Sequence, residues 1–210
     1  MPPPPTTPAP PPAGARERPL HVVQVLSDAG AEPGGHVRSL AAGLVARGVR
    51  VTVCAPPAAG PAREFAGAGA HFASLPVRRR ARALAVLRSV SAPADVMHAH
   101  GLGAGLLAAL ALRGRDGVAL VVTWHARARL VGVPAPAVRL LERRVVRAAR
   151  VVLGATSELV DRARRHGARD ARLAPVALPA AGDGPVGAPG DGEAATVAHV
   201  LSVYDELRAP

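Results

Sequence analysis

Apolar residues recur along this chain in two alternating patterns. Short continuous apolar runs, such as LHVVQVL at 20–26 and VRVTVCA at 49–55, are typical of buried parallel strands. Between such runs, apolar residues return every three or four positions, which is typical of helices packed on a sheet. The alternation of strand, loop and helix predicts a parallel sheet with right-handed crossovers.

The same patterns give the expected extent of each element. The predicted strands occupy residues 20–26, 49–55, 71–75, 95–99, 118–124, 150–153 and 172–176. The predicted helices occupy residues 36–47, 62–66, 78–90, 102–112, 135–149 and 157–166. We therefore expect an α/β fold, a Rossmann-like parallel sheet flanked by helices, in a domain that covers residues 19–179.

The two ends of the chain have a different pattern. Residues 1–18 are rich in proline and predict a disordered tail, and residues 180–192 predict a flexible Gly/Pro/Asp linker. Residues 193–210 return to helical spacing, and their apolar stripe needs a surface to pack against, which we expect to be the main domain. That stripe consists of Val197, Val200, Leu201, Tyr204 and Leu207.

The amino-acid composition limits the classes of partner that the protein is expected to bind. Of the 210 residues, 49% are hydrophobic and only 2% aromatic, so Ala, Val and Leu must build the core. The formal net charge of +11 favours anionic partners. Base stacking needs aromatic side chains, so we expect no nucleic-acid partner.

The cysteine count and the N-terminus bear on location. Cys54 is the only cysteine, so no intrachain disulfide forms, which fits a reducing cytoplasm. The Pro-rich N-terminus lacks the apolar stretch of a secretory signal. We expect a cytoplasmic protein that touches the inner face of a membrane as a peripheral protein.

Polar and small residues gather just after the predicted strands. Because the carboxyl ends of parallel strands form the ligand crevice of an open α/β sheet, these residues are predicted to face one site. The candidates are Gly34, Gly35, His36, His98, His100, Gly101, Trp124, His125 and Ser157.

Two glycines in this set, Gly34 and Gly35, are predicted to open a helix. A helix N-terminus offers free backbone amides to phosphate, and glycine lets the ligand approach. The alternative is a turn that needs a permissive backbone. Ser157 is predicted to cap the helix that follows it, with a second role beside the ligand left open.

The histidines have competing interpretations. His98 and His100 share a face of an extended strand, and with His125 they raise the question of a metal site. No nearby carboxylate or cysteine completes that ligand set, so we expect no metal there. His98 can equally be a satisfied interior histidine, whereas the imidazole of His125 can hold a sugar hydroxyl or phosphate, or act as a base.

The segment 138–150 carries five arginines. They form either a solvated face or a footprint for an anionic membrane. The sequence leaves both interpretations open.

In five segments, this chain resembles the N-terminal domain of family-4-type retaining glycosyltransferases. The segments are PGGHVRSLAAGLVARGVRVTVCAP (33–56), ADVMHAHG (94–101), VVTWHA (121–126), LERRVVRAARVVLGATSEL (141–159) and HGARDARLAPVALP (166–179). The resemblance implies one half of a GT-B fold, in which the N-terminal domain mainly holds the acceptor and the C-terminal domain mainly holds the nucleotide sugar.

The resemblance also implies roles. Gly34 and Gly35 would lie near the donor phosphates, with Ser157 beside them, and His125 would lie next to the transferred sugar. His36, His98, His100, Gly101 and Trp124 would shape the acceptor pocket. Such enzymes typically need no metal or other cofactor, and several act on lipid or cell-envelope acceptors.

The chain departs from the family after Pro179, where no donor-binding domain follows. We therefore expect an acceptor-side half-enzyme that is inactive as an isolated chain, with a second chain as one source of the donor half. The alternatives are a non-catalytic or partner-dependent binding module, and a related enzyme such as a sugar-nucleotide epimerase.

Overall fold

The computed structural model describes residues 18–28, 31–57, 61–128, 132–174 and 191–208. The predictions for the tail at 1–17 and for the linker at 180–190 lie outside these residues. No helix in the described ranges is both long and apolar enough to cross a membrane.

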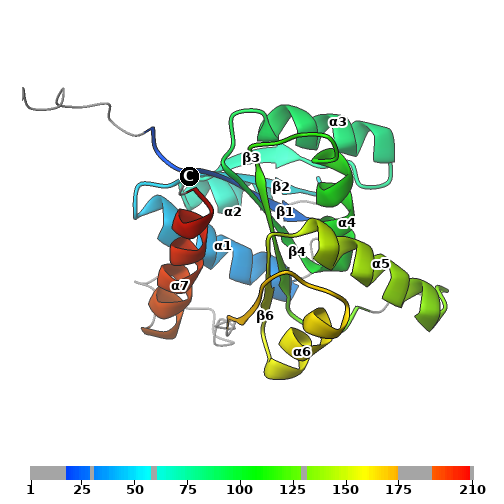
Figure 1. Ribbon diagram of the computed structural model, residues 1–210. Helices are drawn as coiled ribbons and strands as arrows, with labels where there is room; N and C mark the ends of the chain where they lie inside the picture. Colours follow the sequence, from blue (N-terminus) through cyan, green and yellow to red (C-terminus); the bar gives the residue numbers. More distant parts are fainter. Residues whose placement is uncertain (1–17, 29–30, 58–60, 129–131, 175–190, 209–210) are drawn as a thin grey trace, which may run out of the picture.

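One seven-stranded sheet, parallel throughout, forms the middle layer (Figure 1). Its strands are β1 (His21–Leu26), β2 (Arg50–Ala55), β3 (His71–Ser74), β4 (Val96–His100), β5 (Ala119–Trp124), β6 (Val151–Gly154) and β7 (Ala171–Leu173). The spatial order is β3-β2-β1-β4-β5-β6-β7, so the chain reverses direction across the sheet between β1 and β4. Ligands of open α/β sheets bind outside the carboxyl ends of the strands at such a reversal.

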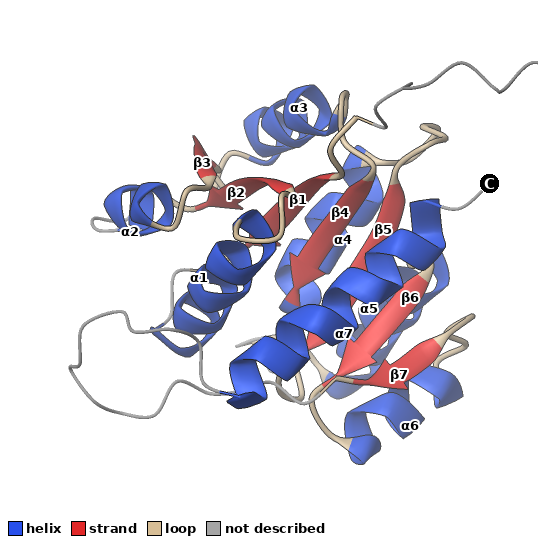
Figure 2. Cartoon of the chain, turned by 90° about the vertical axis from the view of Figure 1, so that its left-hand side faces the viewer, coloured by secondary structure: helices blue, strands red, loops and turns tan. Residues whose placement is uncertain are grey.

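Helices cover both faces of the sheet (Figure 2). They are α1 (Ala31–Val45), α2 (Pro61–Gly67), α3 (Arg80–Ser91), α4 (Gly101–Ala111), α5 (Ala135–Ala148), α6 (Ser157–Arg165) and α7 (Asp191–Arg208). The apolar residues of α1, α2 and α7 join one core cluster, and those of α3, α4, α5 and α6 join the other. The predicted α/β architecture is confirmed.

Alternation along each strand divides side chains between these two faces. Val22 and Leu26 of β1 pack on the side of α1 and α7, whereas Val23 and Val25 pack on the opposite side. By the same alternation, Gln24 points toward α1 and α7. The same face carries His98, His100 and Thr123, whereas His21 and Thr52 lie on the opposite face.

The start of α1 corrects one prediction. The helix begins at Ala31, five residues before the expected start at His36, so Gly34 and Gly35 lie inside it. Pro33 is compatible with this earlier start because the first helical turn needs no amide donor from that residue. Glycine and proline in the segment SDAGAEPGG had indicated a loop.

The C-terminal helix α7 packs on α1 and across β5 and β6 (Figure 2). Val197, Val200 and Tyr204 are buried there as the apolar stripe predicts, and Val203 is buried with them. Helix α1 approaches closely at Gly43, where a Cβ atom would lie 2.6 Å from a Val197 methyl group. The end of the chain is therefore an integral layer of the domain.

Candidate functional site

A cavity of about 280 Å³ opens at the carboxyl ends of β1, β4 and β5. It lies at the reversal of strand order, where the fold places a ligand. Its walls combine apolar residues with the polar side chains of Ser27, Asp28, His100, Trp124, His125, Arg127 and Glu142. Four of the sequence candidates, namely His100, Gly101, Trp124 and His125, line it.

Three histidines from three elements meet beside this cavity. His36 comes from α1, His100 ends β4, and His125 follows β5; each offers a ring nitrogen within 4.8 Å of the others. The His36 ring meets the His125 ring edge-on, with centroids 5.1 Å apart, and Nδ1 of His100 lies 3.2 Å from Nε2 of His125. We call these three residues the histidine cluster.

Beneath the cluster lies a buried hydrogen-bond network, formed by side chains on the face that α1 and α7 cover. The Gln24 amide nitrogen donates to the Tyr204 hydroxyl at 3.0 Å, and the Gln24 oxygen lies 2.7 Å from Nε2 of His100. Nδ1 of His98 contacts the same hydroxyl at 2.5 Å, and its Nε2 lies 2.6 Å from the Thr123 hydroxyl. The network fixes the ring orientation of His100.

His98 is therefore not a cavity residue. It is 1% exposed and makes hydrogen bonds through both ring nitrogens, as the interior interpretation requires. Because two residues along a strand return to the same face, His98 and His100 do share a face. Only His100, one step nearer the carboxyl edge, reaches the cavity.

Burial keeps the imidazoles of His98, His100 and His125 neutral. Loss of water lowers the pKa of His98 and His100 well below the usual value for histidine, and the neighbouring histidines lower it further. Desolvation, aided by His36, lowers the pKa of His125 to about 4. A neutral imidazole carries one N–H donor and one lone pair, so His125 can hold a hydroxyl or accept a proton.

The N-terminal turns of α1 and α4 supply backbone near the site. A side chain at Gly34 would meet no atom within 4 Å, so the helix surface there is open to a ligand. Gly101, the first residue of α4, has φ of +83° and lines the cavity. That left-handed backbone turns the chain sharply from β4 into α4, and glycine adopts it without strain.

Trp124 lies on the face of the sheet opposite to the histidine cluster. Its ring packs edge-on against His166 with centroids 6.5 Å apart, and the residue is 4% exposed. Its indole N–H finds no hydrogen-bond acceptor among the described residues. Since Trp124 lines the cavity, this donor is suited to an oxygen atom of a ligand.

Ser157 lies outside the cavity lining, and its expected capping role is corrected. The residue that caps α6 is Thr156, whose hydroxyl accepts from the Leu159 amide at 3.3 Å, and Ser157 is the first residue of the helix. Both residues are exposed. The choice between two adjacent hydroxyl residues depends on the backbone angle at Thr156, which the sequence does not specify.

Sequence reasoning missed several residues of the site. Asp28 is the second residue after β1, and its position after an apolar run was an available signal. Glu142 was hidden among the arginines of α5, yet it is 1% exposed and binds Arg162 through both carboxylate oxygens at 3.2 and 2.7 Å. Gln24 and Tyr204 lie 180 positions apart, and no local pattern joins them.

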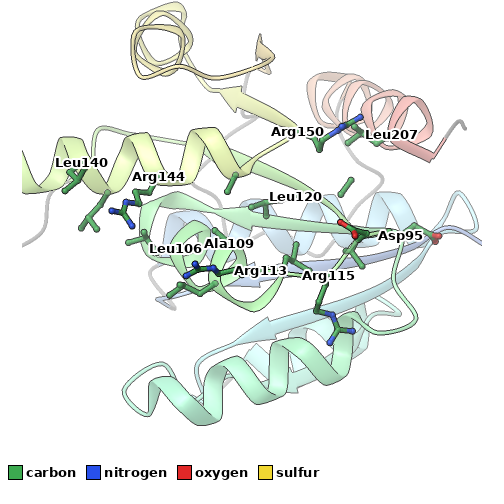
Figure 3. Close-up of a pocket in the computed structure, with 18 residues that line it drawn as sticks. Asp95, Leu106, Ala109, Arg113, Arg115, Leu120, Leu140, Arg144, Arg150 and Leu207 are labelled. Carbon is green, nitrogen blue, oxygen red and sulfur yellow. The ribbon is translucent and has the colours of Figure 1, made fainter.

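A second, larger hollow lies at the opposite edge of the sheet (Figure 3). This groove of about 960 Å³ borders the amino ends of β4, β5 and β6, next to α4 and α5. Arg113, Arg115, Arg144 and Arg150 line it together with leucines. Leu110 and Leu140, also in its lining, are 47% and 54% exposed, so the groove offers both positive charge and apolar surface.

The sheet order and the cavity at its reversal define a Rossmann-like α/β domain, the fold of one half of a GT-B glycosyltransferase. The chain belongs to the family described as "Glycosyl transferase 4-like domain", which matches residues 31–179. A comparison with curated proteins finds no match for this chain. The resemblance inferred from the five sequence segments is confirmed.

Solved structures of glycosyltransferases share this fold at low sequence identity. A sucrose-phosphate synthase chain from Thermosynechococcus elongatus aligns with a TM-score of 0.60 and 15% identity, over 90% of this chain and all of that one. HepE from Anabaena, in complex with UDP-glucose, aligns with a TM-score of 0.59 and 12% identity, over 75% of this chain and 44% of that one.

MurG from Acinetobacter baumannii aligns with a TM-score of 0.51 and 16% identity, over 65% of this chain and 41% of that one. The chain therefore spans less than half the length of HepE and MurG, and all of the sucrose-phosphate synthase chain.

Proposed function

We propose that this chain is the acceptor-side domain of a retaining glycosyltransferase, which moves a sugar from a nucleotide-diphosphate sugar to a hydroxyl group. The observation that carries the proposal is the neutral His125 imidazole in the wall of the cavity at the strand reversal of a glycosyl transferase 4-like domain. HepE, a relative in fold, binds UDP-glucose.

In this proposal, His125 contacts the transferred sugar. Its Nε2 atom faces His100, and its Nδ1 atom has no hydrogen-bond partner among the described residues, so Nδ1 is the atom for a sugar hydroxyl. His36, His100, Gly101 and Trp124 shape the acceptor pocket, while His98 supports it from below through the Gln24–Tyr204 network.

The donor phosphates approach the first turns of α1 and α6. Gly34 offers an uncrowded helix surface there, with Gly35 next to it in α1, and Ser157 opens α6 at an exposed position. The nucleotide sugar is a co-substrate, and the transfer itself uses no metal or other cofactor in this scheme. Most of the stabilisation of a departing diphosphate comes from positive groups and amides placed around it.

We further propose that a second chain with a donor-binding half is a partner of this domain. The cavity described above then holds the acceptor, and the partner holds most of the nucleotide sugar. We place the complex in the cytoplasm, against the inner face of the membrane, with a lipid or cell-envelope acceptor.

The exposed arginines on or next to α5, two of which also line the groove, support the membrane contact. Five arginines on or next to α5 are exposed, and none forms an ion pair within the described part of the chain. These are Arg139, Arg143, Arg144, Arg147 and Arg150. With the exposed Leu140 between them, they fit an anionic lipid surface.

Thermal unfolding with a ligand panel tests the transferase proposal. UDP, GDP, ADP and their common sugar conjugates are added to the metal-free protein. A ligand at a hundred times its dissociation constant adds about 2.7 kcal/mol, which raises the unfolding midpoint by about 5–10 °C. We expect one nucleotide class to do so, with a smaller shift in His125→Ala and an unchanged shift in His71→Ala, because His71 is exposed at the sheet edge.

The proposal fails if no nucleotide or sugar conjugate shifts the midpoint of a cooperatively folding protein. Formation of an isomer from the nucleotide sugar alone, without any acceptor, would instead indicate an epimerase.

Sedimentation with lipid vesicles tests the membrane contact. Arg144→Glu combined with Arg147→Glu should weaken binding to anionic vesicles, since each basic residue near such a surface contributes about 1 kcal/mol. Arg63→Glu with Arg78→Glu is the matched control, because both residues are exposed and remote from the groove lining. Equal loss in the two double variants would show a general charge effect and no docking face.

A further inference from the structure

We propose that the histidine cluster, His36, His100 and His125, is a binding site for a divalent transition-metal ion such as Zn²⁺. The sequence predicted no metal because His98, His100 and His125 lacked a carboxylate or cysteine to complete them. The structure changes the membership of the set, since His36 from α1 takes the place of His98. Three imidazoles are themselves a sufficient set of protein ligands for Zn²⁺, with a fourth position left open.

The geometry of two of these ligands already fits. Zn–N bonds of about 2.0–2.1 Å in a tetrahedral site place neighbouring ligand nitrogens about 3.3 Å apart. Nδ1 of His100 and Nε2 of His125 are 3.2 Å apart. The ring nitrogen of His36 lies within 4.8 Å of both, so a small adjustment of its side chain completes the triangle.

A hydrogen bond to Gln24 orients the His100 ring in the way that is usual for histidine metal ligands. Its Nε2 lies 2.7 Å from the Gln24 oxygen, and the Gln24 amide nitrogen in turn donates to Tyr204. With Nε2–H donating to that oxygen, the lone pair of Nδ1 faces His125. A second ring nitrogen that donates to an amide or carboxylate oxygen is a regular feature of histidine metal ligands.

Binding of a metal ion to this site requires no net release of a proton. Without a metal, the 3.2 Å contact is one N–H···N hydrogen bond from His125 to His100. When an ion binds, the single proton of His125 moves from Nε2 to Nδ1 and the Nε2 lone pair becomes the ligand, so no net proton leaves the protein. Three neutral ligands leave the ion with its double positive charge, which favours an anion such as phosphate or hydroxide at the open position.

Soft and borderline ions suit such ligands. Imidazole sets favour Zn²⁺, Cu²⁺, Ni²⁺ and Co²⁺ over Mg²⁺ and Ca²⁺, which prefer oxygen. The proposed ion is not the cofactor of sugar transfer. It binds Nε2 of His125, whereas the proposed function assigns the sugar hydroxyl to Nδ1 of the same ring.

Calorimetric titration of the untagged chain with Zn²⁺, without any nucleotide, tests the site. We expect one ion per chain, and affinity lower by about tenfold or more in His36→Gln and in His125→Gln. His71→Gln is the matched control, since His71 is an exposed histidine outside the cluster, and its affinity should stay at the wild-type value. Far-UV circular dichroism establishes that each variant is folded.

Absorption spectroscopy with Co²⁺ tests the metal site in the wild-type chain, without any substitution. Co²⁺ added to the wild-type chain should give the visible absorption bands of a four-coordinate site, and Mg²⁺ should not displace it. The proposal is overturned if the folded wild-type chain takes up no Zn²⁺ or Co²⁺, or if both glutamine variants bind as tightly as the control. Zinc binding with no response to any nucleotide would leave this inference standing and refute the transferase proposal.

Discussion

At the scale of single residues, Tyr204 connects the end of the chain to the site at its centre. Its hydroxyl contacts both Gln24 and His98, and Gln24 holds His100. Burial raises the pKa of Tyr204, so the hydroxyl stays protonated and can donate. One side chain of α7 thus completes the network that orients a cavity histidine.

Tyr204→Phe should therefore destabilise the protein. The change leaves the Gln24 amide and a His98 nitrogen without their buried partner, at a cost of about 1–3 kcal/mol in the free energy of unfolding. Urea denaturation measures this loss. Ser202→Ala, which removes an exposed hydroxyl from the same helix, should change stability by less than about 0.5 kcal/mol. Equal effects of the two substitutions would show that the network contributes nothing.

Glu142→Gln should likewise weaken the fold. The Glu142 carboxylate is 2% exposed and binds Arg162 through both oxygens, so losing its charge should cost about 1–3 kcal/mol. Glu158→Gln is the control, because Glu158 pairs with Arg127 on the surface at 60% exposure, where an ion pair contributes at most about 1 kcal/mol. Guanidinium denaturation of both variants compares them, and a larger loss in Glu158→Gln would contradict this assignment.

Sequence position alone located part of the site. His100, Gly101, Trp124 and His125 directly follow or end apolar strand runs, and the fold brings such positions to one edge. The contacts with Gln24 and Tyr204 were not predictable, because they depend on how α7 returns across the sheet. The contact of His36 with His100 and His125 was also not predictable, because the place of His36 depended on the true start of α1.

At the scale of elements, the packing of α7 on α1 is the least ordinary feature. Two strongly apolar faces meet where Gly43 leaves room for Val197. Apolar spacing predicted that α7 would pack on the domain. It did not predict which helix receives it, because several helices have similar apolar stripes.

Gly43→Ala tests this contact. Alanine favours a helix over glycine by about 1 kcal/mol, but here its Cβ atom would lie 2.6 Å from a methyl group of the stiff Val197 side chain. Overpacking of this kind costs about 1–3 kcal/mol, so we expect a net loss of stability. Gly67→Ala, at a helical glycine with open space, should not destabilise.

A double-mutant cycle measures whether Gly43 and Val197 interact directly. Val197→Ala should lose stability on its own and should relieve the Gly43→Ala clash, with a coupling of about 0.5–3 kcal/mol. Additive effects in thermal or urea unfolding would mean that the two helices do not meet at this point.

At the scale of the whole molecule, the two edges of the sheet carry different hollows with different side chains. The carboxyl edge carries the cavity and the histidine cluster, and the amino edge carries the arginine-lined groove. The strand alternation of the sequence was enough to predict the sheet and its helices. The strand order, and with it the position of the reversal between β1 and β4, came only from the structure.

The most direct test of the account is a magnetic-resonance titration that observes the histidine rings. The metal-free chain, labelled with ¹⁵N in its histidines, is titrated with the nucleotide sugars of the panel. We expect one of them to shift the ring signals of His125 and His36 and to leave those of His71 unchanged. Shifts confined to His71, or none with any nucleotide sugar, would contradict the claim that the carboxyl edge of this sheet binds a sugar donor.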